Sequence, residues 1–196
     1  MILKKKIVLA STSRYRAELL ERLRMPFVVT QPHTDETPLL NEKPAQTAAR
    51  LSLAKAASVV KAFPESLIIG SDQVADLNGM PIGKPVTRER AHKQLLTMRG
   101  QTLVFHSGVA LINAITGNIQ SFVIPTTVHF RKYSDAEIEH YLDREHALDC
   151  AGSAKSEGLG IALIAAIQSD DPTALVGLPL IALVAMLKNE ECGVLE

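Results

Sequence analysis

The sequence predicts an α/β fold: a mixed, twisted sheet flanked by helices, with two lobes that share the sheet and a central cleft between them. Short apolar runs alternate with segments whose apolar residues recur at helical spacing, which is typical of βαβ units. Two long β-branched runs in the middle of the chain, joined by Thr116-Gly117-Asn118, indicate a hairpin. Because no repeat and no clear linker divides the 196 residues, we expect one domain over residues 1–196.

Local signals mark several boundaries. Pro44 suits the first turn of a helix, Thr87 and Ser134 are suited to N-cap positions, and Asn78-Gly79 indicates a tight turn. The expected elements are a strand at 5–10, a helix at 14–24, a strand at 27–30, a loop at 31–43, a helix at 45–62, a strand at 67–77, a helix at 88–98, paired strands at 103–115 and 119–130, a helix at 134–145, a strand at 161–167 and a helix at 178–188.

Charge and hydropathy narrow the class of protein. Lys and Arg together number 21, as do Asp and Glu, and this zero net charge disfavours a duplex nucleic-acid binder, which normally carries a basic excess. The N-terminal apolar run is too short for an export signal, and the apolar run at 175–187 is too short to span a bilayer. Cys150 and Cys192 lack metal-ligand spacing and fit a reducing compartment. We therefore expect a cytoplasmic protein that is not inserted in a membrane.

The first cluster of polar residues lies in "VLASTSRYR", residues 8–16, where a strand ends and a helix begins. Helix N-termini carry unpaired N–H groups and a partial positive charge, so they favour anions. Ser11 and Ser13 add hydroxyls, and Arg14 and Arg16 add guanidinium groups that match phosphate oxygens. The alternative is that Ser13 is only an N-cap and that the arginines form a solvated face.

Two acidic positions could complete a site. Asp72 stands at the polar end of the buried strand in "IIGSDQV", where a carboxylate without a partner is costly and where ligands of α/β sheets bind. Its alternative is a structural acid that pairs with a lysine. Glu36 follows Asp35 in the loop at 31–43, where acids are usually just solvated.

Two lysines have unusual surroundings. Lys55 lies in a helix of Ala, Leu and Ser, and Lys84 stands in "IGKPVT" between a glycine and a proline, which suits a phosphate contact but is also found in plain turns. His140 and His146 lie on a strongly charged helix that reads as a solvated face.

Cations at Arg16, Lys55 and Lys84 would bind phosphate, and acids at Glu36 and Asp72 would hold a divalent metal or activate water. The residues alone therefore predict a phosphate substrate, Mg²⁺ or Mn²⁺ as cofactor, and hydrolysis or transfer.

With these motifs the chain resembles the Maf family of nucleoside triphosphate pyrophosphatases over nearly its whole length. "LASTSRYR" resembles the family's Leu-Ala-Ser-x-Ser-x-x-Arg motif. "DETP", Lys55, "IIGSDQV" and "GKP" occur in the family's order, and "AGSAKSEGLG" and "LVGLPL" resemble its two late motifs.

The resemblance implies an inosine-triphosphatase-like fold and a reaction that releases a nucleoside monophosphate and pyrophosphate, often by a homodimer. It also implies a catalytic role for Asp72, as general base or metal ligand, and a contribution of Glu36 to the metal site. The residues that it assigns to phosphate binding are Ser11, Ser13, Arg16, Lys55 and Lys84.

Three positions depart from many members of the family. Tyr15, Gln73 and Glu157 stand where many members have arginine, threonine and glutamine, and they resemble the branch that hydrolyses 7-methyl-GTP. The alternatives are a dTTP or UTP pyrophosphatase, a nucleotidyltransferase, or a non-catalytic interaction protein that inhibits septum formation.

Overall fold

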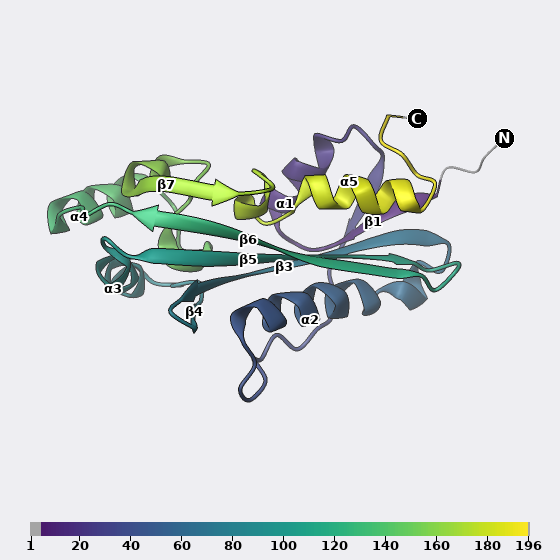
Figure 1. Cartoon of the computed structure of the whole chain (residues 1–196), viewed down its shortest axis with the longest axis horizontal. Helices are drawn as coiled ribbons and strands as arrows, with labels where there is room; N and C mark the ends of the chain where they lie inside the picture. The colour runs from purple at the N-terminus through teal and green to yellow at the C-terminus, as the bar shows by residue number, and fades with distance from the viewer. Residues whose placement is uncertain (1–4, 196) are drawn as a thin grey trace.

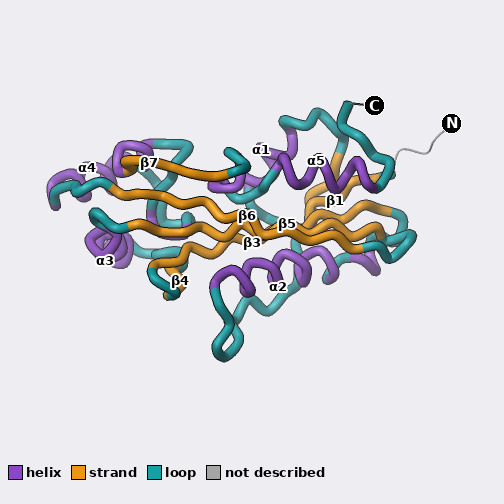
Figure 2. Tube along the Cα trace, viewed as in Figure 1, coloured by secondary structure: helices purple, strands orange, loops and turns teal. Residues whose placement is uncertain are grey.

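The computed structural model describes residues 5–195, so residues 1–4 and 196, at the ends of the predicted domain, lie outside the described residues. Within this range seven strands form one sheet in the order β2-β1-β3-β5-β6-β7, with β4 beside β3 (Figures 1 and 2). β1 runs parallel to β2 and β3, whereas the other pairs are antiparallel. The strands are β1 (Lys6–Ala10), β2 (Phe27–Thr30), β3 (Ser66–Leu77), β4 (Met80–Ile82), β5 (Thr102–Asn113), β6 (Ile119–Phe130) and β7 (Ile164–Ser169).

Helices cover both faces of the sheet. α1 and α5 lie on one face and α2 on the other, while α3 and α4 lie together at the opposite end of the long strands (Figure 1). The predicted mixed α/β fold is therefore confirmed. Among residues 5–195, no helix is long and apolar enough to cross a membrane. The helices are α1 (Arg14–Glu21), α2 (Pro44–Ala57), α3 (Arg88–Met98), α4 (Asp135–Arg144) and α5 (Leu180–Asn189).

The two faces of the sheet follow from alternation along the strands. In β1, Ile7 and Leu9 pack against α1 and α5, while Val8 and Ala10 point to the side of α2. All four are buried, because successive side chains of a strand point to opposite faces and both faces are covered here. A central strand of this kind is rigid, and it delivers the segment after Ala10 to a fixed place.

A separate apolar cluster forms at the other end of the sheet. There α3 and α4 pack on the far halves of β5 and β6, with Leu95, Phe105 and Ile138 buried among them. The buried hydroxyl of Tyr133 donates to the Leu95 carbonyl, so the ring is packed without an unpaired polar group. Since β3 and β5 run through both ends, the middle of these strands forms the floor between two groups of helices.

Two helices end earlier than predicted. α2 ends at Ala57, and a separate 3₁₀ turn at Val60–Ala62 follows, where the sequence predicts one helix to residue 62. The Ser58 hydroxyl donates to the Lys55 carbonyl and accepts from the His33 N–H, and such local bonds compete with helix continuation. α1 ends at Glu21 rather than at residue 24, because the chain reverses through left-handed backbone at Arg24 (φ 54°).

The last strand begins later than predicted. β7 starts at Ile164, because Leu159–Leu163 form a 3₁₀ helix, whose last carbonyls, of Ala162 and Leu163, accept from the side chain and the backbone N–H of Arg131. β4 was not expected as a strand; it pairs with the end of β3 across the predicted Asn78-Gly79 turn.

α2 lies unusually close to the sheet. Its facing residues, Ala48, Ser52 and Ala56, recur every fourth position and are small. Opposite them are Gly70 and Gly108, where an added Cβ would lie 2.1 Å from the Ser52 carbonyl oxygen and 2.3 Å from that of Ala48, respectively. Glycine at both positions is thus required by packing, and the close approach carries Lys55 to the sheet.

We therefore expect Gly108→Ala to lower the free energy of unfolding by about 1–3 kcal/mol, because its methyl group would push against the backbone of α2. Urea denaturation measures the change. Gly83→Ala is the matched control: it has nothing within 4 Å of the added Cβ and should stay within about 0.5 kcal/mol of wild type. Equal stability of both variants would contradict the close packing of α2.

Candidate active site

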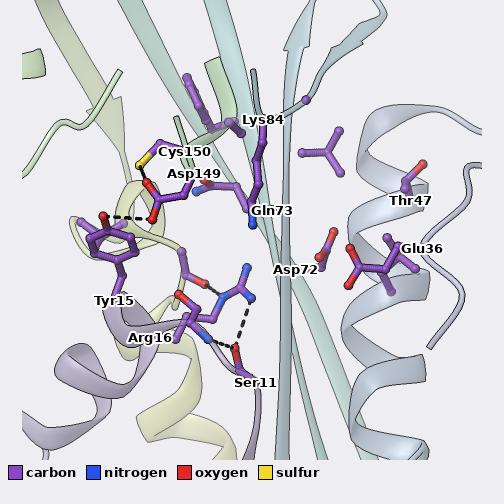
Figure 3. Close-up of a pocket in the computed structure, with 18 of the residues that line it drawn as sticks. Ser11, Tyr15, Arg16, Glu36, Thr47, Asp72, Gln73, Lys84, Asp149 and Cys150 are labelled. Atoms are coloured by element: carbon purple, nitrogen blue, oxygen red, sulfur yellow. Dashed lines mark hydrogen bonds between the residues drawn. The ribbon is translucent and has the colours of Figure 1, made fainter. Parts of the chain in front are cut away.

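A cleft of about 690 Å³ lies between the two groups of helices, above the middle of β3 (Figure 3). This is within the usual size of a small-molecule site. The structure brings all ten predicted site residues to its walls, and their individual roles stay predictions. They are Ser11, Ser13, Tyr15, Arg16, Glu36, Lys55, Asp72, Gln73, Lys84 and Glu157.

The centre of the cleft is an ion cluster around Lys55. Its ammonium Nζ lies 2.7 Å from Oδ1 of Asp72 and 2.8 Å from Oε1 of Glu36. Lys55 and Asp72 are buried, while the Glu36 side chain is 61% exposed. Asp72 does pair with a lysine, as the alternative interpretation predicts. That lysine, however, is Lys55, which is itself a predicted site residue.

Glu36 is ionised by its neighbours. Burial opposes the charge, but the hydrogen bond and the charge of Lys55, with Lys84 and Arg16 farther away, bring the pKa of Glu36 below its ordinary value. Lys84 extends into the cleft from the turn after β4 (Figure 3). Three cations, Lys55, Lys84 and Arg16, thus face Glu36 and Asp72, so this part of the cleft retains one positive charge for an anionic ligand.

The loop that carries Glu36 is held on α2 by Glu42. The Glu42 carboxylate accepts from Arg50 Nε at 2.6 Å and from Nη2 at 2.8 Å, which is a bidentate pair. It also accepts from the Leu39 N–H and the Thr47 hydroxyl. The exposed loop is therefore fixed at its base, although its tip is in solvent.

The start of α1 forms the opposite wall. Ser13 is at the N-cap position, but its side chain makes no capping hydrogen bond, so the hydroxyl remains for a ligand. Arg16 Nε donates to the Gly177 carbonyl at 2.9 Å, and its Nη1 lies 3.5 Å from the Ser11 hydroxyl. Burial lowers the pKa of Arg16, opposed by the charges of Asp72 and Glu36, yet a guanidinium stays cationic at neutral pH.

The two carboxylates fit a divalent cation shared with a ligand. Asp72 and Glu36 converge on one point, which Lys55 occupies. Mg²⁺ is commonly held by one or two carboxylates together with substrate phosphates. Within residues 5–195, no group of three or more His, Cys, Asp or Glu side chains is arranged to hold a metal alone. This donor set suits a cation whose remaining ligands are phosphate oxygens.

The other end of the cleft is aromatic and amphipathic. The Tyr15 ring lies 4.8 Å from the Arg14 guanidinium carbon and 5.6 Å from the Lys155 ammonium, measured to the ring centroid. Burial raises the pKa of Tyr15, so the phenol is neutral, and its hydroxyl oxygen lies 3.5 Å from Oδ2 of Asp149 (Figure 3). The ring is thus already in contact with two cations, and the acidic groups that line this end of the cleft are Asp149 and Glu157.

The side-chain amide of Gln73 is oriented so that its oxygen, and not its nitrogen, is available in the cleft. Its amide nitrogen lies within 3.0 Å of three acceptors: the Ser107 hydroxyl oxygen and the carbonyl oxygens of Ala174 and Leu175. An amide nitrogen has two hydrogens, and the protein uses both. Only the amide oxygen is left for a ligand, so Gln73 acts there as a hydrogen-bond acceptor.

Several residues of the site were not singled out from the sequence. Gly177 supplies the carbonyl that holds Arg16 and that also lies 2.8 Å from the Ser71 hydroxyl; its motif "LVGLPL" was noticed, but without a role. Asp149 and Cys150 line the cleft beside Tyr15 and carried no local signal. Burial, with the charges of Asp149 and Glu157, raises the pKa of Cys150 to about 12, so its thiol is not a nucleophile at neutral pH.

The fold and the site define a class: an α/β protein whose cleft combines cationic side chains, two carboxylates that converge on Lys55, and an aromatic wall. A model of the Maf-like protein family matches residues 6–190, and the chain belongs to the Maf family.

Three similar relatives carry the name 7-methyl-GTP pyrophosphatase. The protein of Methylobacillus flagellatus is 54% identical over 96% of this chain and 98% of its own length. That of Aromatoleum aromaticum is 57% identical over 94% and 95%, and that of a Polaromonas species 58% identical over 93% and 83%. Among solved structures, the Staphylococcus aureus Ham1 protein matches with a TM-score of 0.48 and 16% identity, over 65% of this chain and 73% of that one.

The Glu42–Arg50 pair leads to a titration prediction. Arg50 lowers the pKa of Glu42 from 4.5 to about 2. Because the folded pKa lies below the unfolded one, the pair stabilises the loop fully above about pH 4.5 and is lost as the pH falls toward 2. Side-chain carboxyl NMR should give a Glu42 midpoint near 2, and Arg50→Met should move it up toward 4.5. A wild-type midpoint at the ordinary value would show that the loop is not anchored in this way.

Proposed function

We propose that this protein hydrolyses 7-methyl-GTP to 7-methyl-GMP and pyrophosphate. The observation that carries the proposal is the division of one cleft: cations and carboxylates for a triphosphate at one end, and the Tyr15 ring with the carboxylates of Asp149 and Glu157 for a positively charged base at the other. The names of the relatives and the membership of the Maf family support the same reaction.

In the reaction, the oxygen of a water molecule attacks the α-phosphorus and a new P–O bond forms. The bond from that phosphorus to the bridging oxygen breaks, and pyrophosphate leaves with the electron pair. Asp72 takes the proton of the attacking water, while Arg16, Lys55 and Lys84 hold the phosphate oxygens on which charge accumulates. Substrate phosphates would compete with Glu36 and Asp72 for Lys55.

Glu36 and Asp72 are the residues that would hold a divalent cation. When bound, such a cation supplies positive charge to the phosphate oxygens. As the substrate brings the remaining ligands, we expect activity to require Mg²⁺ or Mn²⁺ and to be lost in EDTA.

The preference for the methylated base follows from its charge. Methylation at N7 leaves the purine with a delocalised positive charge, which an aromatic face such as that of Tyr15 stabilises by about 0.5–2 kcal/mol. A hydrogen bond from the guanine N–H edge to a carboxylate such as Glu157 contributes about 1.5–3 kcal/mol. The free oxygen of Gln73 can accept from the same edge.

Two further parts complete the proposal: the protein acts in the cytoplasm, as its cysteine usage indicates, and it forms a homodimer, as the family resemblance implies.

Product analysis tests the reaction. Purified protein incubated with 7-methyl-GTP and Mg²⁺, without any acceptor, should release 7-methyl-GMP and pyrophosphate in equal amounts. A conjugated product that forms only with an acceptor would indicate a nucleotidyltransferase, and absence of turnover with all nucleotides would indicate a binding protein; either outcome contradicts the proposal.

Asp72→Asn should lower kcat by roughly 10²–10⁴-fold, because the amide keeps the shape of the side chain but cannot accept the proton of water. Steady-state kinetics measures the loss, and circular dichroism checks that the variant is folded. Asp76→Asn is the matched control: it lies on the same strand, pairs with His106 outside the cleft and should keep near-wild-type kcat. Near-wild-type turnover of folded Asp72→Asn would remove Asp72 from the mechanism.

Base selection can be tested with Tyr15→Ala and Glu157→Gln. Both variants should lose kcat/KM for 7-methyl-GTP more than for GTP, by about tenfold, because the contacts they remove act on the charge of the methylated base. Parallel measurements with GTP, dTTP and UTP give the ranking of substrates. Preference of the wild type for dTTP or UTP, or an unchanged ranking in both variants, would overturn the assignment.

A further inference from the structure

Glu157 stands on a tight turn that closes on the backbone of Lys155. The Lys155 carbonyl accepts from the N–H groups of Gly158 and Gly160, both at 3.0 Å. At Gly160, an added Cβ would lie 2.6 Å from backbone atoms of Lys155, so the turn is as compact as the chain allows. The side chain of Glu157 is exposed and lines the cleft from this turn.

A carboxylate outside the cleft holds this turn in place. Glu145, directly after the end of α4, accepts from the Leu159 N–H at 2.8 Å through Oε2, and its Oε1 lies 3.4 Å from the Lys155 ammonium. Its side chain is only 14% exposed. The Leu159 N–H, opposed by burial and aided by Lys155, brings the pKa of Glu145 below its ordinary value, so the carboxylate is charged. The Glu145 carboxylate thus contacts the turn at both ends, at Lys155 and at Leu159.

Two further contacts belong to the same support. The buried hydroxyl of Tyr141, on α4, accepts from the Lys155 N–H at 3.1 Å. At Gly158, an added Cβ would lie 2.4 Å from Oε2 of Glu145, so glycine is needed there for the carboxylate to reach the Leu159 N–H. Gly158 and Gly160 are therefore explained by the packing of the turn against Glu145 and the Lys155 backbone, without any contact to a ligand.

The grip also extends to the aromatic wall. The ammonium of Lys155, paired with Glu145, is the same group that lies over the Tyr15 ring. Glu145 therefore contacts both the turn that carries Glu157 and the lysine that lies over Tyr15. Among the described residues, Glu145 itself is not part of the cleft lining.

We infer that Glu145 is the positioning residue for base selection: it fixes the turn that carries Glu157 and pairs with the Lys155 ammonium beside Tyr15, so that this charge is offset where the cationic base would bind. This inference rests on the proposed function, in which these two side chains contact the methylated base. It adds a residue that acts through others and makes no contact with the substrate.

The measured quantity is the methyl preference, defined as kcat/KM for 7-methyl-GTP divided by kcat/KM for GTP. Glu145→Ala should lower it roughly tenfold, the size expected when one charge-assisted contact is misplaced. Glu145→Gln keeps an acceptor for the Leu159 N–H and should lose less. Glu139→Ala is the matched control on α4: it breaks the pairs with Arg88 and His92, away from the turn, and should leave the preference unchanged.

A double-mutant cycle separates positioning from a general loss of structure. If Glu145 acts through Glu157, then adding Glu145→Ala to Glu157→Gln should lower the methyl preference much less than it does in wild type. Hydrogen–deuterium exchange at residues 158–160 should become faster in Glu145→Ala and not in Glu139→Ala.

A methyl preference within about twofold of wild type in folded Glu145→Ala, or full additivity with Glu157→Gln, would overturn the inference. If Glu145→Ala does not fold, the same comparison with Glu145→Gln decides. If the wild type prefers another nucleotide, the proposed function fails; the inference is then judged by whether Glu145→Ala changes the ranking of nucleotides, which an unchanged ranking would refute.

Discussion

The ammonium of Lys55 between Asp72 and Glu36 is the interaction on which the rest of the site depends. Lys55 and Asp72 are both buried, and leaving one charge of such a pair alone costs about 3–5 kcal/mol. The pair can form only because α2 lies close to the sheet, and α2 lies close because Gly70 and Gly108 have no side chains. Packing and electrostatics thus fix the same geometry: a helix, a strand and a loop meet at one nitrogen atom.

Around this point both ends of the cleft combine regular elements with loops. At the end with the ion cluster, Arg16 lies on α1, Lys55 on α2 and Asp72 on β3, whereas Glu36 and Lys84 lie on loops. At the other end, Tyr15 lies on α1, Gln73 on β3 and Glu157 on a turn. The carbonyls of Ala174 and Leu175 hold the Gln73 amide, and Glu145 at the end of α4 holds the turn of Glu157.

Features that depend on a few neighbouring residues could be predicted from the sequence. The buried strand that contains Asp72, the N-cap at Thr87 and the capping box at Ser134 all appear as expected. The start of β7 could not be found in this way, because the apolar residues before it form a 3₁₀ helix, Leu159–Leu163, that is held by Arg131, about thirty residues earlier. Asp149 and Glu145 were missed for the same reason: each looks like an ordinary surface acid until the fold places it.

The carbonyl of Gly177 is 161 residues away from Arg16, whose guanidinium it holds. The wall of the cleft at the start of α1 is therefore completed only by a segment made near the end of synthesis. While the chain is being made, its first third carries the serines and the arginine but has nothing to orient them. A nascent chain should therefore lack an ordered cleft until the segment that contains Gly177 has been made and has packed against α1.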